Sequence, residues 1–253
     1  MQRLPAVALI LALSSLVLAQ TTPTPQPVSR DTRALALLSQ CATTMGSAAI
    51  LDTYGTGTLT PTNPSGPSAT IVSRSKGTKM RNDITRASGV QTFALGATGG
   101  WSTQQGNRTT MPYAAFAYPR PEYVPALACI IDPSRPNMNV ALVGVEQVGG
   151  KAAYHVKFNV SPSANDDSES AISEFHIFLD QQSFIVLKAQ NYVFDPKALP
   201  NRSKWETYYS DYRTINGALM PFQIENYLAG QKVANITFNS VQINTGVPDS
   251  AFE

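Results

Sequence analysis

Apolar residues recur at a helical period in one early segment of the chain. The residues at intervals of three and four positions are Ala34, Leu37, Leu38, Cys41 and Met45. This spacing places side chains on one face of an α-helix. Asp31 stands before the segment, where an N-cap is needed, and Gly46 stands where the helix must end. The pattern therefore predicts one amphipathic helix at the start of the domain.

Beyond the helix the period changes to two, and turn residues separate the alternating segments. This is the pattern of antiparallel hairpins. Hairpins are predicted over residues 68–85, 89–110, 140–160 and 174–194, with turns at Lys76–Gly77, Gly99–Gly100, Gly149–Gly150 and Asp180–Ser183. In the last of them, Ile177 and Leu187 are expected on one face. A final strand is predicted over 232–243, and a shift of its apolar phase near Asn239–Ser240 indicates a bulge.

The segment WETYYSDYRTINGALMPF, residues 205–222, is unusually rich in aromatic residues. Asn216–Gly217 within it is a strong turn signal, because both residues tolerate positive φ. The segment is therefore predicted to be a further hairpin, whose aromatic side chains suit a half-buried pleated surface. Asp211 and Arg213 are expected to form cross-strand pairs at the surface.

Two longer segments follow neither period. Prolines interrupt residues 111–136, yet many apolar side chains there need burial, which predicts a lid of short helices and irregular chain across one face of the sheet. Residues 161–171 are polar and include Asp166, Asp167 and Glu169. These three could bind calcium, and a solvated loop is the alternative. The loop is favoured, because the alternate spacing and the Gly of a calcium loop are missing.

The N-terminus has the features of an export signal. Arg3 precedes an apolar run from Leu4 to Leu18, and small residues before Gln20 form a cleavage site. An uncleaved anchor is the alternative, but the run is short for a membrane span. The predicted organisation is a signal peptide at 1–19, a Thr/Pro-rich linker at 20–30 and a single domain at 31–253. The expected location is the periplasm, or outside the cell.

Composition allows a sizeable core and argues against highly charged partners. Of 253 residues, 43% are hydrophobic and 14% are charged, which suits one β-rich domain. There are 19 basic and 17 acidic residues, so loss of Arg3 with the signal peptide leaves a net charge of about +1. A nearly neutral chain gives no reason to expect nucleic acid or an acidic membrane as partner.

Cys41 and Cys129 are the only cysteines of the chain. Exported proteins commonly bridge such a pair. A bridge here would tie the predicted helix to the lid and would require Cα atoms within about 7 Å. Two separately buried thiols are the alternative. Metal binding is not expected, because no His or carboxylate cluster accompanies either cysteine.

The sequence contains no strong pattern for catalysis. His155 shares a strand face with Lys157 and is expected to be exposed, while His176 is expected on the wetter face of its strand. Neither histidine belongs to a zinc motif, and a serine elbow, a phosphate loop and a dinucleotide fingerprint are all missing from the sequence. Asp211 and Glu225 are candidate paired carboxylates, although strand carboxylates are usually surface residues, and a Ser-His-Asp set of distant residues stays open. We expect no catalytic residue, no metal, no cofactor and no enzyme.

The segment from Tyr208 to Glu253 resembles the C-terminal half of the LolA/LolB-like superfamily, the periplasmic lipoprotein carriers and their relatives. The matching positions are Asp211, Tyr212, Arg213, Gly217, Pro221, Asn244, Val247, Asp249 and Phe252. The hairpins at 140–160 and 174–194, where Asp180 begins a turn, are similar to the middle hairpins of that family. The resemblance implies an α+β fold: a curved antiparallel sheet forming an unclosed β-barrel, with the N-terminal helix and the lid on its concave side.

In the carriers, the space between sheet and helices accepts lipoprotein acyl chains. The resemblance therefore implies a periplasmic protein that binds apolar ligands or lipoproteins, as carrier or chaperone, with acyl chains as ligands, an envelope protein as a further partner, and a monomeric state. The candidate wall residues are Met80, Ile84, Phe93, Ile177, Leu187, Met220, Phe222 and Phe238 from strands, with Phe116 and Leu127 from the lid. The alternative is a structural or interaction module of the envelope, on the same scaffold, whose concave face is a close-packed core.

Overall fold

The computed structural model describes residues 28–62, 66–96, 99–111, 137–160, 173–194 and 201–253. Several predicted features lie outside these residues: the signal peptide, most of the linker, the lid with Phe116, Leu127 and Cys129, and the acidic loop. Within the described residues, no helix combines the length and the apolar character that a membrane crossing requires.

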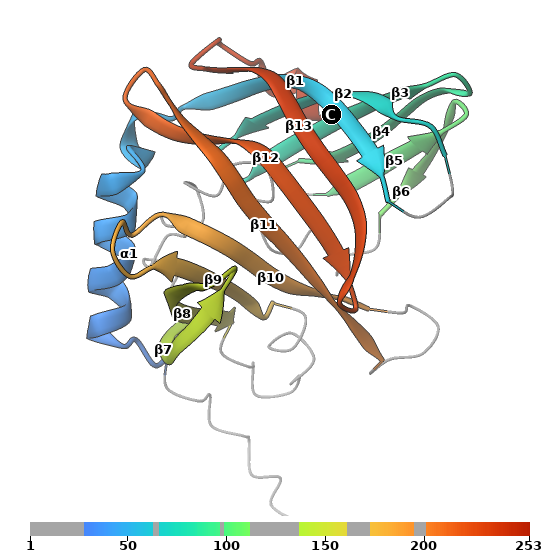
Figure 1. Ribbon diagram of the computed structural model, residues 1–253. Coiled ribbons are helices and arrows are strands. Elements are labelled where there is room, and N and C mark those ends of the chain that lie inside the picture. Colours follow the sequence, from blue (N-terminus) through green and yellow to red (C-terminus); the bar gives the residue numbers. More distant parts are fainter. Residues whose placement is uncertain (1–27, 63–65, 97–98, 112–136, 161–172, 195–200) are drawn as a thin grey trace, which may run out of the picture.

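Thirteen strands of the described residues form one antiparallel sheet (Figure 1). They are β1 (Asp52–Pro61), β2 (Ala69–Lys76), β3 (Lys79–Arg86), β4 (Gly89–Leu95), β5 (Gly100–Gln104), β6 (Asn107–Thr110), β7 (Met138–Val148), β8 (Lys151–Val160), β9 (Phe175–Asp180), β10 (Val186–Phe194), β11 (Arg202–Ile215), β12 (Ala218–Leu228) and β13 (Gln231–Ile243). The spatial order is β6-β5-β4-β3-β2-β1-β13-β12-β11-β10-β9-β8-β7. Two meanders are thus joined where the first strand pairs with the last. The sheet curves strongly but does not close, which confirms the predicted unclosed barrel.

The predicted hairpins are present, with two additions. The segment predicted as one hairpin over 89–110 contains three strands, because Gln105 and Gly106 both have positive φ (52° and 82°) and form a second turn. Strand β1 was not predicted from the alternation. Its buried positions include Thr53, Gly55 and Gly57, so small and polar residues stand where large apolar ones would mark a strand.

Helix α1 (Thr32–Thr44) is fixed at both ends. At its start, Asp31 accepts hydrogen bonds from the backbone N–H groups of Arg33 and Ala34 (2.8 and 3.1 Å), which confirms the predicted N-cap. The Asp31 N–H also bonds to the Val140 carbonyl of β7 (2.9 Å). At its end, the Met45 carbonyl accepts from Leu219 N–H of β12 (3.0 Å). The helix therefore spans from β7 to the tip of the β11–β12 hairpin (Figure 1).

The sheet has two different faces. We call the face that packs against α1 the inner face; it carries the large apolar cluster that includes Ala34, Leu38 and Cys41 of the helix. The opposite, outer face carries a small cluster around Phe178 and many paired polar side chains. Short 3-10 helices, η1 (Ser47–Ala49) and η2 (Asp249–Phe252), complete the described elements. The core thus lies on the concave side of the sheet.

Candidate functional site

Most of the predicted wall residues lie on the inner face. Five of them belong to its apolar cluster: Ile84, Ile177, Met220, Phe222 and Phe238. Phe93 is half-buried and packs against this cluster. Met80 is half-buried beside Leu95 of the neighbouring strand. Their shared face is therefore established, while contact with a ligand remains a prediction.

Leu187 lies on the outer face, so its predicted place beside Ile177 is wrong. The pairing of β9 with β10 shifts register between Val186 and Lys188, which leaves Leu187 as an extra residue. Because of this bulge, Val186 joins the inner cluster while Leu187 joins the outer cluster with Phe178. Alternation counted through a bulge assigns the following side chains to the wrong face.

The Asp-Tyr-Arg segment of β11 contains a gap in the pairing of this strand with β12. Asp211 has φ 50° and is not paired with β12. Its carboxylate accepts two hydrogen bonds from the Arg213 guanidinium (3.1 and 2.6 Å), and this guanidinium lies 4.0 Å from the ring centre of Phe222. The predicted cross-strand pairing is therefore wrong, since the ion pair runs along one strand. Between them, the Tyr212 hydroxyl donates to the Val186 carbonyl (2.6 Å), and burial raises the pKa of Tyr212 well above its ordinary value.

Polar side chains also occupy inner-face positions, and sequence reasoning did not assign them a role. Asn82 Oδ1, Asn191 Nδ2, Trp205 Nε1 and Asn226 Oδ1 are buried and have no hydrogen-bond partner among the described residues. Asn82 was predicted on the same face as Met80 and Ile84, which is correct. A sequence signal existed for Asn191 and Asn226 too, because each is a polar residue in phase with apolar neighbours of its strand.

Packing around Phe238 is close. Gly55 of β1 lies under its ring: a Cβ added to Gly55 would stand 3.0 Å from the ring carbons. The void between Phe238, Met220 and Ser73 measures only about 10 Å³, about the least that holds one water. This part of the inner face is filled by its own side chains.

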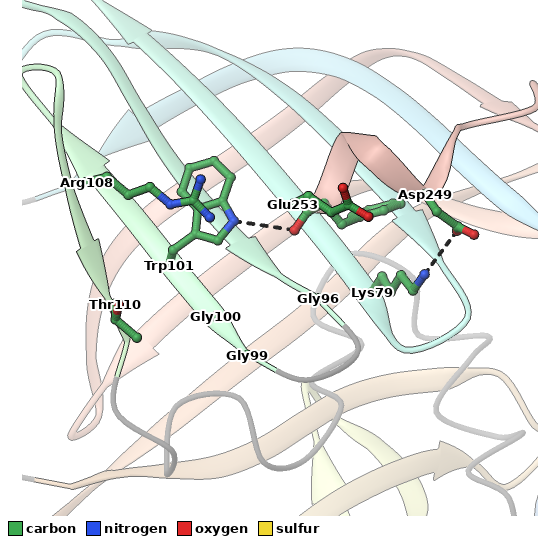
Figure 2. Close-up of a pocket in the computed structure, with 10 residues that line it drawn as sticks. Lys79, Gly96, Gly99, Gly100, Trp101, Arg108, Thr110, Asp249 and Glu253 are labelled. Carbon is green, nitrogen blue, oxygen red and sulfur yellow. Dashed lines mark hydrogen bonds and ion pairs between the residues drawn. The ribbon is translucent and has the colours of Figure 1, made fainter.

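A second hollow of about 340 Å³ lies where β5 and β6 meet the C-terminal turn (Figure 2). The Arg108 guanidinium covers the Trp101 ring at 4.1 Å, and Trp101 Nε1 donates to the Phe252 carbonyl (3.4 Å). Lys79 is paired with Asp249 (3.0 Å). The hollow is open and is lined by the charged side chains of Lys79, Arg108, Asp249 and Glu253, so it does not resemble an apolar ligand site.

The two histidines lie together on the outer face, and both are buried. His155 Nε2 and His176 Nδ1 are 2.7 Å apart, while Glu146 and Glu174 bond to the other ring nitrogens at 2.5 and 2.9 Å. His155 is only 8% exposed, so the prediction of an exposed His155 is wrong. Its strand face was predicted correctly; its neighbours, including the stacked Phe178 ring, cover it. Within the described residues, no group of three His, Cys, Asp or Glu is arranged to hold a metal ion.

Cys41 is buried in the inner cluster, where its Sγ lies 3.8 Å from Met45 Sδ. Its predicted partner, Cys129, lies outside the described residues. The bridge between them stays a prediction.

The geometry defines a class of protein: a strongly curved, unclosed antiparallel sheet with one helix over an apolar inner face. No protein-family model and no curated protein sequence matches the chain. Solved structures do match. One is described as an outer membrane lipoprotein-sorting protein domain from Vibrio parahaemolyticus (TM-score 0.58, 12% identity, 87% of this chain and 96% of that one). Another is a LolA superfamily protein from Nitrosomonas europaea (0.55, 14%, 87% and 97%). A DUF1329 family protein from Desulfovibrio piger is similar to a like degree (0.54, 14%, 87% and 97%). The chain has the LolA-like fold.

Proposed function

We propose that this protein binds acyl chains against the inner face of its sheet and acts, without catalysis, as a carrier or chaperone of lipids or lipidated proteins in the periplasm. One of the structures with the same fold is described as an outer membrane lipoprotein-sorting protein domain. The observation that carries the proposal is the one-sided distribution of the core. Apolar side chains of both meanders lie together on the concave inner face of the sheet.

The energetics suit this ligand class. Each CH₂ group moved from water to an apolar surface contributes about 0.8 kcal/mol. A long acyl chain thus offers enough free energy for micromolar binding after the costs of association. Isolated polar ligands gain little from such a face, because burial of unpaired polar groups is costly.

A second candidate is an interaction module of the envelope whose inner face is permanently filled by the chain itself. The close packing around Phe238 favours it locally, since a void of about 10 Å³ accepts no ligand. The two candidates differ in whether the inner face exchanges its contents.

Binding of a fluorescent fatty acid to the mature protein distinguishes the two candidate functions. We expect binding at micromolar affinity or better, and Phe222→Trp should weaken it about tenfold, because a larger ring occupies ligand space. Gln223→Trp is the matched control, since the next residue of β12 points to the outer face, and its affinity should equal that of the wild type. Both variants should unfold cooperatively near the wild-type urea midpoint.

Binding equally weakened by both variants would point to general destabilisation instead of a wall. No binding of fatty acids or of lipids extracted with the protein from its native envelope would leave the interaction module as the better account.

A further inference from the structure

Three polar side chains on neighbouring strands form a patch in the inner face. Asn191 of β10 is 7% exposed and Asn226 of β12 is 4% exposed; Trp205 of β11 is half-buried, with its Nε1 atom fully covered. Asn191 Nδ2, Trp205 Nε1 and Asn226 Oδ1 have no hydrogen-bond partner in the described part of the chain. Most buried polar atoms of folded proteins are paired, so such a cluster requires an explanation.

Strand register brings the three side chains together. Asn191 and Trp205 are direct cross-strand partners. Asn226 pairs with Thr207, two residues along β11 from Trp205, so it is the diagonal neighbour of Trp205 on the same face. Directly opposed Cβ atoms lie about 5 Å apart and diagonal ones about 7 Å. Asn191 and Asn226 lie two strands apart, about 10 Å, with Trp205 between them. A ligand amide placed over Trp205 therefore faces all three polar atoms.

The contrast with the outer face of the same strands argues against a structural role. There, Lys188 bonds to Glu206 (3.1 Å) and Tyr227 bonds to Glu225 (3.1 Å). The sheet thus pairs its polar groups where they face outward. On the inner face, Ala189 and Ile224, each two residues away along its strand, belong to the apolar cluster. Thr207, the direct partner of Asn226, is a buried polar neighbour.

The chemistry of the three groups specifies a partner. Two N–H donors, from Asn191 and Trp205, suit a carbonyl oxygen, and one acceptor, Asn226 Oδ1, suits an N–H beside it. All three groups are uncharged, which fits a neutral ligand group better than a carboxylate. From Asn226, the inner positions of β12 continue through Ile224 and Phe222 to Met220, about 20 Å along the strand. This length matches an extended hydrocarbon chain, which would have to displace the side chains that now cover these buried positions.

We propose that Asn191, Trp205 and Asn226 form the subsite that recognises the amide group of an amide-linked acyl ligand, whose chain then follows the inner face of β12. The inference rests on the proposed function and specifies the ligand. The three polar atoms are covered in the free protein. The atoms that cover them must therefore move aside when the ligand binds, and the ligand amide then supplies the missing hydrogen bonds.

Ligands of equal chain length test the subsite. N-ethylhexadecanamide has a carbonyl and an N–H, ethyl hexadecanoate has only the carbonyl, and hexadecane has neither. Competition with a fluorescent fatty acid measures each affinity. For the wild type we expect the amide to bind about tenfold more tightly than the ester, and the ester more tightly than hexadecane.

Each variant should abolish one of the affinity differences between the amide, the ester and hexadecane. Asn226→Leu should bring the amide within about twofold of the ester. Trp205→Phe and Asn191→Leu should weaken amide and ester together and leave hexadecane unchanged. Gln190→Leu, on the outer face next to Asn191, is the matched control and should retain the wild-type order. Because the replaced atoms are unpaired in the free protein, none of the three subsite variants should lower the melting temperature.

The outcomes distinguish failure of the amide subsite from failure of the proposed acyl-chain binding. Equal affinity for amide, ester and hexadecane overturns the subsite and leaves acyl binding intact. A fall in melting temperature in the three subsite variants, with all ligands weakened alike, assigns the residues a structural role and also overturns the subsite. Failure of every ligand to bind overturns the proposed function and the subsite with it.

Discussion

At the scale of single residues, the most unusual cluster is the buried His155–His176 pair. Glu146 and Glu174 accept hydrogen bonds from one ring nitrogen of each histidine, so these two nitrogens carry protons. The facing nitrogens lie 2.7 Å apart in this buried pair. Two fully protonated rings would set two N–H groups against each other across that contact.

Acid should weaken this arrangement. Burial lowers the pKa of His176, helped by the charges of His155 and Lys157, although the hydrogen bond and the charge of Glu174 act in the opposite direction. The unfolded chain then takes up the proton more readily than the folded one, so the free energy of unfolding should fall as the pH drops below about 6.5. Urea unfolding between pH 5 and 7.5 measures this slope. His176→Gln should flatten it, and an unchanged slope in that variant would show that other groups cause it.

Glu174 does not titrate in that window. Burial raises its pKa, but the hydrogen bond from His176 and the charges of Lys157, His176 and Arg202 outweigh burial, so the net direction is downward. Its contribution to stability is present above the ordinary range of a Glu and is lost only in stronger acid.

At the scale of elements, sequence patterns predicted hairpins well and irregularities unevenly. Asn216 and Gly217 have φ 47° and 86°, as their turn requires, and the expected bulge in β13 is present, because Asn239 is skipped between Thr56 and Gly57 of β1. The bulge at Leu187 was missed, since Ile185 and Leu187 alternate as an unbroken strand would. Local sequence encodes turns through φ preference, whereas this bulge is set by the register that β10 adopts against β9.

The contact between α1 and the β11–β12 turn was also not predictable from periodicity. Gly46 has φ 64°, and a Cβ there would stand 2.2 Å from the Gly217 carbonyl oxygen. We expect Gly46→Ala to lower the free energy of unfolding by about 3 kcal/mol, through backbone strain and the displaced turn together. Gly77→Ala is the control: its φ is 56° but no atom lies within 4 Å, so only strain, about 1 kcal/mol, applies. Equal losses in urea unfolding would mean that the helix end does not pack tightly on the turn.

At the scale of the whole molecule, the two meanders depend on the pairing of β1 with β13. The ends of that junction are fixed by polar contacts: Asn244 bonds to Leu51 N–H and the Ala49 carbonyl (both 2.8 Å), and the buried Asp52 carboxylate accepts from Thr245 and Gly246. Burial raises the pKa of Asp52, but these hydrogen bonds outweigh it and hold that pKa below its ordinary value. The inner face is continuous only because this pairing brings both halves onto one side.

The close approach of β1 to β13 depends on Gly57, where the register shifts. A Cβ at Gly57 would stand 2.3 Å from the Thr237 carbonyl oxygen and 2.8 Å from the Phe238 Cα, which are backbone atoms that cannot move alone. Gly57→Ala should therefore cost about 3 kcal/mol and expose the amides of β1 and β13 together to hydrogen exchange. Gly55→Ala, two residues away, meets only the Phe238 ring at 3.0 Å, which can tilt, so about 1 kcal/mol is expected. Because Phe238 belongs to the inner face, Gly57→Ala should also weaken fatty-acid binding more than Gly55→Ala does. Lost protection confined to β1, with β13 still protected, would contradict the view that one strand pair unites the two halves.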